Sequence, residues 1–128
     1  PAQMILHIIE EIAKDETFEI SVGKLGFLKT SWNFFRDNFQ EVEFFKAKVK
    51  LRDEIRTDWQ NRGKEVFQKV AEIDSSVIFI LDEFPMMLDA MLKNDRKEEA
   101  KSLLRWFRSI RQSPELQDKL RFVIAGSI

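Results

Sequence analysis

Apolar residues follow one another without a break from Val77 to Leu81, and a second, nearly continuous apolar run covers Leu120–Ala125. A parallel strand that is covered on both faces has such a continuous pattern, whereas a half-exposed strand alternates. The residues between the two runs have helical periodicity and are numerous enough for a right-handed crossover, which leaves its two strands parallel and adjacent. The pattern therefore predicts an α/β fold that contains a parallel pair of buried strands.

Apolar spacing also predicts two helices in the first half of the chain. One is amphipathic and ends near Lys14, and the other is capped by Thr57 or Asp58 and stops before Asp74. Between them, Ala47–Leu51 alternates with period two and predicts a half-exposed strand.

The clearest helix is predicted over Lys97–Gln112, and Phe84–Leu88 is expected to form the turn and first helical residues after the first strand. The apolar stripe of the longer helix consists of Ala100, Leu103, Leu104, Phe107 and Ile110, and its basic row consists of Lys101, Arg105, Arg108 and Gln112. A basic row of this kind is able to contact phosphate, nucleic acid or a neighbouring subunit's nucleotide as an arginine finger. It is more often a solvated face.

Two adjacent carboxylates, Asp82 and Glu83, come directly after the first apolar run. Ligands in open α/β sheets lie just beyond the carboxyl ends of the strands, so both acids are expected at a ligand crevice. In nucleoside triphosphatases this is the Walker B arrangement, in which the Asp holds Mg²⁺ and the Glu polarises the attacking water. The alternative is that the acids cap the helix that follows.

The second apolar run closes with Gly126-Ser127-Ile128. In many such ATPases the strand next to Walker B ends in Asn, Ser or Thr, whose side chain contacts the γ-phosphate or the attacking water. Ser127 has the chemistry and the position for that role.

Residues 45–128 resemble archaeal and bacterial AAA-type ATPases related to the STAND class. The matching motifs are Ile80–Pro85, for the pattern hhhhDEhP, and Phe122–Ser127, for the pattern hhhxGS, and residues 57–64 are similar to the segment before Walker B in that family. The resemblance implies a partial three-layer P-loop fold that uses ATP and Mg²⁺. It also implies that Asp82 binds the metal and the nucleotide, that Glu83 is the general base, and that Ser127 senses the γ-phosphate.

The phosphate-binding loop of these enzymes, G-x-x-x-x-G-K-[ST], does not occur in the sequence. The four glycines are Gly23, Gly26, Gly63 and Gly126, and none of them begins the motif. The amides of that loop hold the phosphates and its Lys neutralises them. We therefore expect an internal segment of a longer ATPase, which is inactive alone, binds no nucleotide tightly, and has as its partner the missing N-terminal P-loop segment of the same protein.

Composition fits a single soluble globular domain. The resemblance implies that residues 1–128 are one partial ATPase domain, with a helix and a Phe-rich region in 1–45 and the Walker B to sensor-1 core in 46–128. The chain is 44% hydrophobic and 34% charged, and it has no cysteine, which excludes disulfides and cysteine-based metal or nucleophile sites. Neither a membrane-spanning run nor a basic signal-peptide start is visible. A cytoplasmic protein is expected.

The remaining interpretations concern partners. The net charge of −1 argues against general nucleic-acid binding as the main role, although residues 46–69 carry eight basic and four acidic residues. Phe18–Val22 is expected to be extended, and the aromatic residues over 27–45 are more typical of a core or interface than of a nucleobase-stacking surface. Exposed strand edges favour self-association. The alternative function is a nucleotide-independent protein-interaction module.

Overall fold

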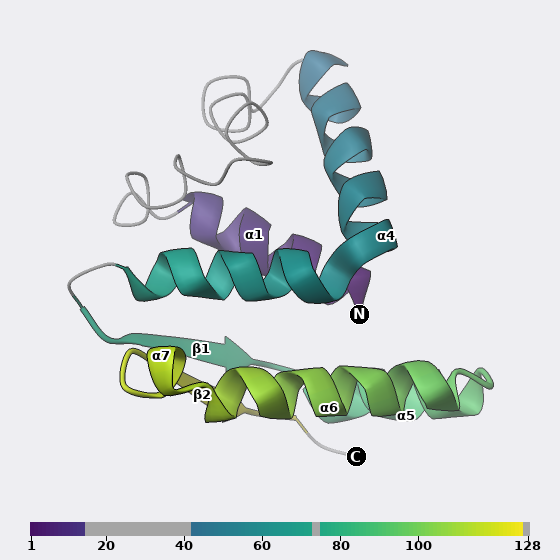
Figure 1. Cartoon of the computed structure of the whole chain (residues 1–128). Coiled ribbons are helices and arrows are strands. Elements are labelled where there is room, and N and C mark those ends of the chain that lie inside the picture. Colours follow the sequence, from purple (N-terminus) through teal and green to yellow (C-terminus); the bar gives the residue numbers. More distant parts are fainter. Residues whose placement is uncertain (15–41, 73–74, 127–128) are drawn as a thin grey trace. The chain divides into compact units, whose positions relative to one another are not determined.

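The computed structural model describes residues 1–14, 42–72 and 75–126 (Figure 1). These residues belong to two compact units, Ala2–Ile73 and Asp74–Ile128. The predicted extended piece at Phe18–Val22 and most of the Phe-rich region lie outside the described residues.

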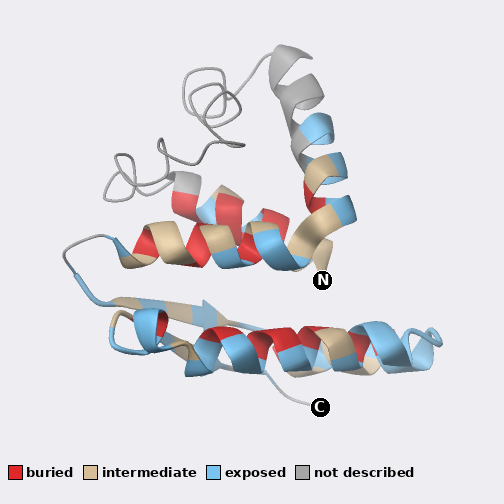
Figure 2. Ribbon diagram, in the orientation of Figure 1, coloured by how far each residue is buried: buried red, intermediate tan, exposed pale blue. Residues whose placement is uncertain are grey.

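Among its described residues, the first unit contains the helices α1 (Ala2–Lys14) and α4 (Val42–Ala71), which contact each other. Both contribute apolar side chains that are almost completely buried (Figure 2), namely Ile5, Ile9 and Ile12 from α1, and Ile55, Val66, Phe67 and Val70 from α4. The predicted first helix is confirmed, with its end at Lys14.

The predicted strand at Ala47–Leu51 is wrong, because α4 runs through these residues. No Gly, Pro or cluster of turn-forming residues separates them from the helical segment that follows, so the sequence contains no signal that would end one element and begin another. A period-two pattern over so few residues is also short enough to be accommodated on a helix.

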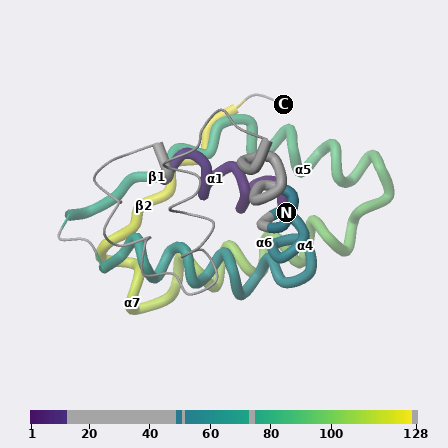
Figure 3. Tube along the Cα trace, turned by 90° about the horizontal axis from the view of Figure 1, so that it is seen from above, coloured from purple at the N-terminus to yellow at the C-terminus, as the bar shows by residue number. Residues whose placement is uncertain are grey.

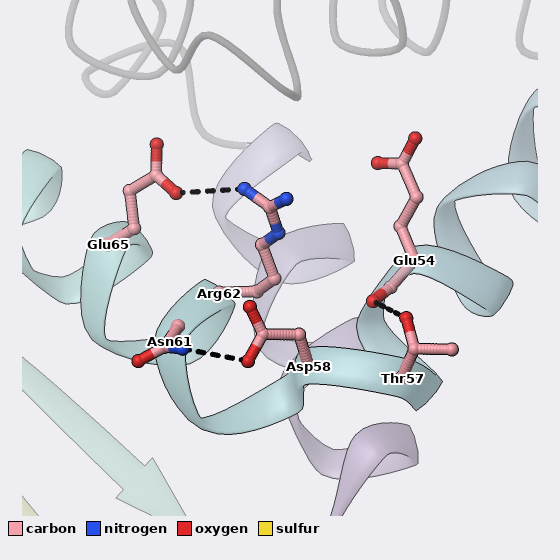
Figure 4. A network of polar contacts seen from close by, with 6 residues as sticks. All are labelled: Glu54, Thr57, Asp58, Asn61, Arg62 and Glu65. Carbon is pink, nitrogen blue, oxygen red and sulfur yellow. Dashed lines mark hydrogen bonds and ion pairs between the residues drawn. The ribbon is translucent and has the colours of Figure 1, made fainter.

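The predicted helix start at Thr57 or Asp58 coincides with a kink in α4. Asp58 has φ −143° and ψ 46°, which are not helical values. Its Oδ1 accepts a hydrogen bond from Asn61 Nδ2 at 2.8 Å, and Thr57 Oγ1 donates to the Glu54 carbonyl at 2.9 Å (Figure 4). The helical segment after Asp58 ends at Ala71, before Asp74 as predicted.

The second unit is a parallel strand pair with helices between the strands. Its elements are β1 (Val77–Leu81), α5 (Phe84–Lys93), α6 (Lys97–Gln112), α7 (Pro114–Gln117) and β2 (Leu120–Ile124). The strands lie side by side (Figure 1 and Figure 3), in a register that runs from Val77 opposite Leu120 to Leu81 opposite Ile124. The predicted mixed α/β class, the parallel pair and the helix over Lys97–Gln112 are confirmed.

An aromatic cluster joins one face of the strand pair to α5 and α6. Phe79 and Phe122 stack across the strands with ring centroids 5.6 Å apart, and Phe107 of α6 meets Phe122 edge-on at 4.9 Å. Phe84, the first residue of α5, lies 5.5 Å from Phe107. These contacts bury the inner stripe of α6, which faces the strands (Figure 2).

The composition of that inner stripe differs from the prediction at two positions. Leu104 is 46% exposed, and Trp106, which was not predicted, is 7% exposed. The buried stripe of α6 therefore contains Trp106 in place of Leu104, so it is rotated around the helix axis relative to the predicted stripe.

The opposite face of the strand pair is open. Ile78 is 63% exposed, Ile80 69% and Val123 48%, so the prediction that the strands are buried on both faces is wrong for these residues. A continuous apolar run is typical of a strand that is buried on both faces, but the run does not indicate which elements cover each face. Within the second unit, the aromatic cluster places α5 and α6 on the other face.

In the part of the chain that the structure describes, no helix is long and apolar enough to cross a membrane.

Candidate functional site

The carboxyl ends of β1 and β2 meet at one edge of the strand pair. Asp82 and Glu83 follow β1 directly and are exposed, and Pro85 lies in the first turn of α5. Gly126, just beyond β2, lies against this turn: a Cβ built on it would be 3.2 Å from Glu83 Cα and 3.4 Å from Pro85 Cδ. The structure therefore brings Asp82 and Glu83 to the end of the second strand.

The turn after β1 is held by backbone and carboxylate hydrogen bonds. Asp82 Oδ1 accepts a hydrogen bond from the Glu83 amide at 2.9 Å, and the Met87 amide donates to the Glu83 carbonyl at 3.0 Å. The Ala125 amide donates to the Leu81 carbonyl at 3.1 Å, which extends the strand pairing to the site. The two acids thus emerge from a defined turn.

Neither acid makes the side-chain cap that the alternative interpretation requires. Glu83 is the N-cap residue of α5, but its side chain forms no capping hydrogen bond. The bond that Asp82 accepts comes from the amide of Glu83 itself, whereas a capping side chain binds an amide of the first helical turn. The described geometry leaves the Glu83 carboxylate without a capping role.

Glu83 has a left-handed backbone conformation, with φ 57° and ψ 14°. For a residue with a Cβ this conformation costs about 1–2 kcal/mol. Residues in costly backbone conformations persist where the surrounding structure imposes them, and they cluster at functional sites. This observation identifies the turn as a candidate site by a criterion independent of the acidic motif.

Ser127, the third residue of the predicted site, lies outside the described residues. Gly126 belongs to the predicted hhhxGS motif, but the sequence assigns no role to it, and its close approach to Glu83 was not predicted. The available signal was its position between the apolar run and Ser127.

The site offers hard oxygen ligands to a cation. Mg²⁺ is usually bound through one or two carboxylates together with waters and substrate phosphates. The exposed Asp82 carboxylate fits such a ligand set. Among the described residues there is no group of three or more His, Cys, Asp or Glu side chains that could hold a metal ion.

The predicted basic row on α6 is exposed at Lys101, Arg105, Arg108 and Gln112. Lys101 donates to Glu98 at 2.6 Å, and this hydrogen bond lowers the pKa of the Glu98 carboxyl. The row has the exposure of a solvated face. A contact with phosphate, nucleic acid or a neighbouring nucleotide stays a prediction.

Comparison with protein-family models, curated proteins and solved structures found no match to this chain. The resemblance to AAA-type ATPases therefore stays a prediction from the two sequence motifs.

Proposed function

We propose that the second unit is the Walker B to sensor-1 part of a P-loop ATPase, in a three-layer fold that other segments of the protein complete. The observation that carries the proposal is the close approach of Gly126 to Glu83. It joins the acidic end of one apolar strand to the Gly-Ser end of its parallel neighbour, and ligands bind at the carboxyl ends of such strands.

The reaction is hydrolysis of ATP to ADP and phosphate. Bound Mg²⁺ supplies charge neutralisation at the β- and γ-phosphates. Asp82 holds the metal, Glu83 accepts a proton from the attacking water, and Ser127 contacts the γ-phosphate. Hydrolysis in such enzymes is coupled to a conformational change.

The chain alone is expected not to bind ATP near micromolar concentration, because the amides and the lysine of the phosphate-binding loop are missing from its sequence. Isothermal titration calorimetry with ATP and Mg²⁺ checks this. Tight stoichiometric binding would overturn the proposal that the loop comes from another segment.

The proposed function is tested most directly in the longer protein. Its reading frame should encode G-x-x-x-x-G-K-[ST] within roughly a hundred residues before Pro1. Phosphate release by that protein should depend on Glu83. A reading frame without the motif, or turnover that is indifferent to Glu83, contradicts the proposal.

A second candidate function, the nucleotide-independent interaction module, is favoured by the exposed side chains of Ile78, Ile80 and Val123. Contiguous apolar surface and unpaired strand edges recruit other chains.

We therefore expect the chain to self-associate as its concentration rises, and Ile80→Thr to weaken this association, since Thr suits a strand but is less apolar. Light scattering over a concentration series provides the measurement. Leu92→Thr is the matched control, because Leu92 is 52% exposed but lies on α5. A clean monomer at high concentration, or equal effects of the two substitutions, contradicts the expectation.

A further inference from the structure

Gly126 occupies a place that a larger residue does not fit. Its φ of +132° lies in a region that L side chains rarely adopt. A Cβ at this position would be 3.2 Å from Glu83 Cα and 3.3 Å from Glu83 N, closer than nine in ten real Cβ contacts. Both neighbours are backbone atoms, so neither moves aside by a side-chain rotation. Any relief has to come from a shift of the backbone, in the turn or at residue 126.

The turn on the other side of this contact is constrained as well. Glu83 is joined to Asp82 by the amide-to-carboxylate hydrogen bond and to Met87 by the first backbone bond of α5. Pro85 fixes its own φ and lies 3.4 Å from the position of a Cβ on Gly126. The backbone of Glu83 therefore lies between the first turn of α5 and Gly126, whereas its side chain is exposed.

Asp95, in the loop between α5 and α6, provides an internal comparison. It is the other described non-glycine residue with positive φ, also 57°. Asp is one of the residues that adopt this conformation routinely, because its short polar side chain forms local hydrogen bonds, whereas Glu is not. The conformation of Glu83 therefore depends more on its surroundings than that of Asp95.

We propose that Gly126 is a positioning residue, which holds Glu83 in its left-handed conformation and so sets where the Asp82 and Glu83 carboxylates lie. Its effect on ATP hydrolysis rests on the proposed function. The coupling between positions 126 and 83 does not, and it is measurable in the chain as it stands.

The test is a double-mutant comparison by thermal unfolding. Gly126→Ala is expected to lower Tm by about 5–15 °C. In a Glu83→Gly background the turn is free to shift, so the loss should fall by about half or more. Asp95→Gly removes the cost of the same positive φ at a different position. In this background, the loss of Tm caused by Gly126→Ala should be unchanged. If Gly126→Ala alone does not fold, the combination with Glu83→Gly should fold and the combination with Asp95→Gly should not. Equal losses in both backgrounds would overturn the proposal.

A second readout separates positioning from simple destabilisation. In the longer ATPase, below the unfolding temperature, Gly126→Ala should lower kcat about 10-fold or more and leave the Kd for ATP unchanged, because misplacing a catalytic group by a fraction of an ångström slows the reaction. Amide chemical shifts of Asp82, Glu83 and Met87 in the short chain should change with it. If the loss of Tm caused by Gly126→Ala depends on the residue at position 83, but the longer protein has no ATPase activity, the positioning of the turn is upheld and the proposed function is refuted. ATPase activity in the longer protein without coupling between positions 126 and 83 would refute the positioning role of Gly126 and leave the proposed function in place.

Discussion

If the proposed function holds, replacing Glu83 by Gln in the longer protein is expected to lower ATP hydrolysis about 10²-fold or more and to leave ATP binding in place. Gln keeps the size and the hydrogen-bonding ability of the side chain but does not accept the proton of the attacking water. Steady-state phosphate release and a fluorescent-nucleotide titration measure the two quantities. Glu115→Gln, the same chemical change at an exposed position of α7, serves as the control and should leave both unchanged.

Asp82→Asn should behave differently from Glu83→Gln. In the proposed site Asp82 would hold Mg²⁺, which would neutralise charge on the nucleotide phosphates, so losing this carboxylate is expected to weaken Mg²⁺-dependent ATP binding as well as turnover. Should both variants hydrolyse ATP at the parental rate and lose only thermal stability, the acids are structural. The interaction module would then be the better account of the chain.

The largest effect on stability is expected for Phe107→Ala. Phe107 is 6% exposed and contacts the rings of Phe84 and Phe122, so it links the start of α5 to β2. Truncating a buried Phe costs about 3–5 kcal/mol, which is a large share of the stability of a small domain. We expect the second unit to unfold or to lose hydrogen-exchange protection at the amides of β1.

Leu104→Ala is the matched control for this substitution. Leu104 lies on the same helix but is 46% exposed, so its truncation should cost less than about 1 kcal/mol. Similar losses for the two variants would mean that the aromatic cluster does not hold the unit together.

The bounds of β1 and α6 could be predicted because their apolar patterns are long and regular and because their ends are marked by charged residues, proline or serine. Ala47–Leu51 shows the limit of such patterns. Its alternation covers too few residues to outweigh the helix that surrounds it. The parallel pairing of the two strands could be predicted from the long segment between them. Parallel strands need a long crossover connection, whereas antiparallel strands can be joined by a short hairpin.

The candidate site was predictable only in part. Asp82 and Glu83 carry a local signal, since two carboxylates directly follow an apolar strand. The left-handed conformation of Glu83 and its contact with Gly126 depend on a meeting of two strand ends that are far apart in the sequence. The local sequence around either residue does not predict such a contact. The exposure of Ile78 and Ile80 could not be predicted locally either, because it depends on which other elements cover that face of the strands.

The parallel pairing of β1 with β2 also constrains when the second unit forms during synthesis. Every backbone bond between the strands joins residues on opposite sides of α5, α6 and α7. The apolar segment Val77–Leu81 therefore cannot pair with Leu120–Ile124 until that second segment has left the ribosome. Helices α5 and α6 form locally in that interval, whereas non-local strand pairing is slow and leaves apolar segments open to aggregation. Until β2 is available, the unpaired edges of β1 are open to pairing with another chain.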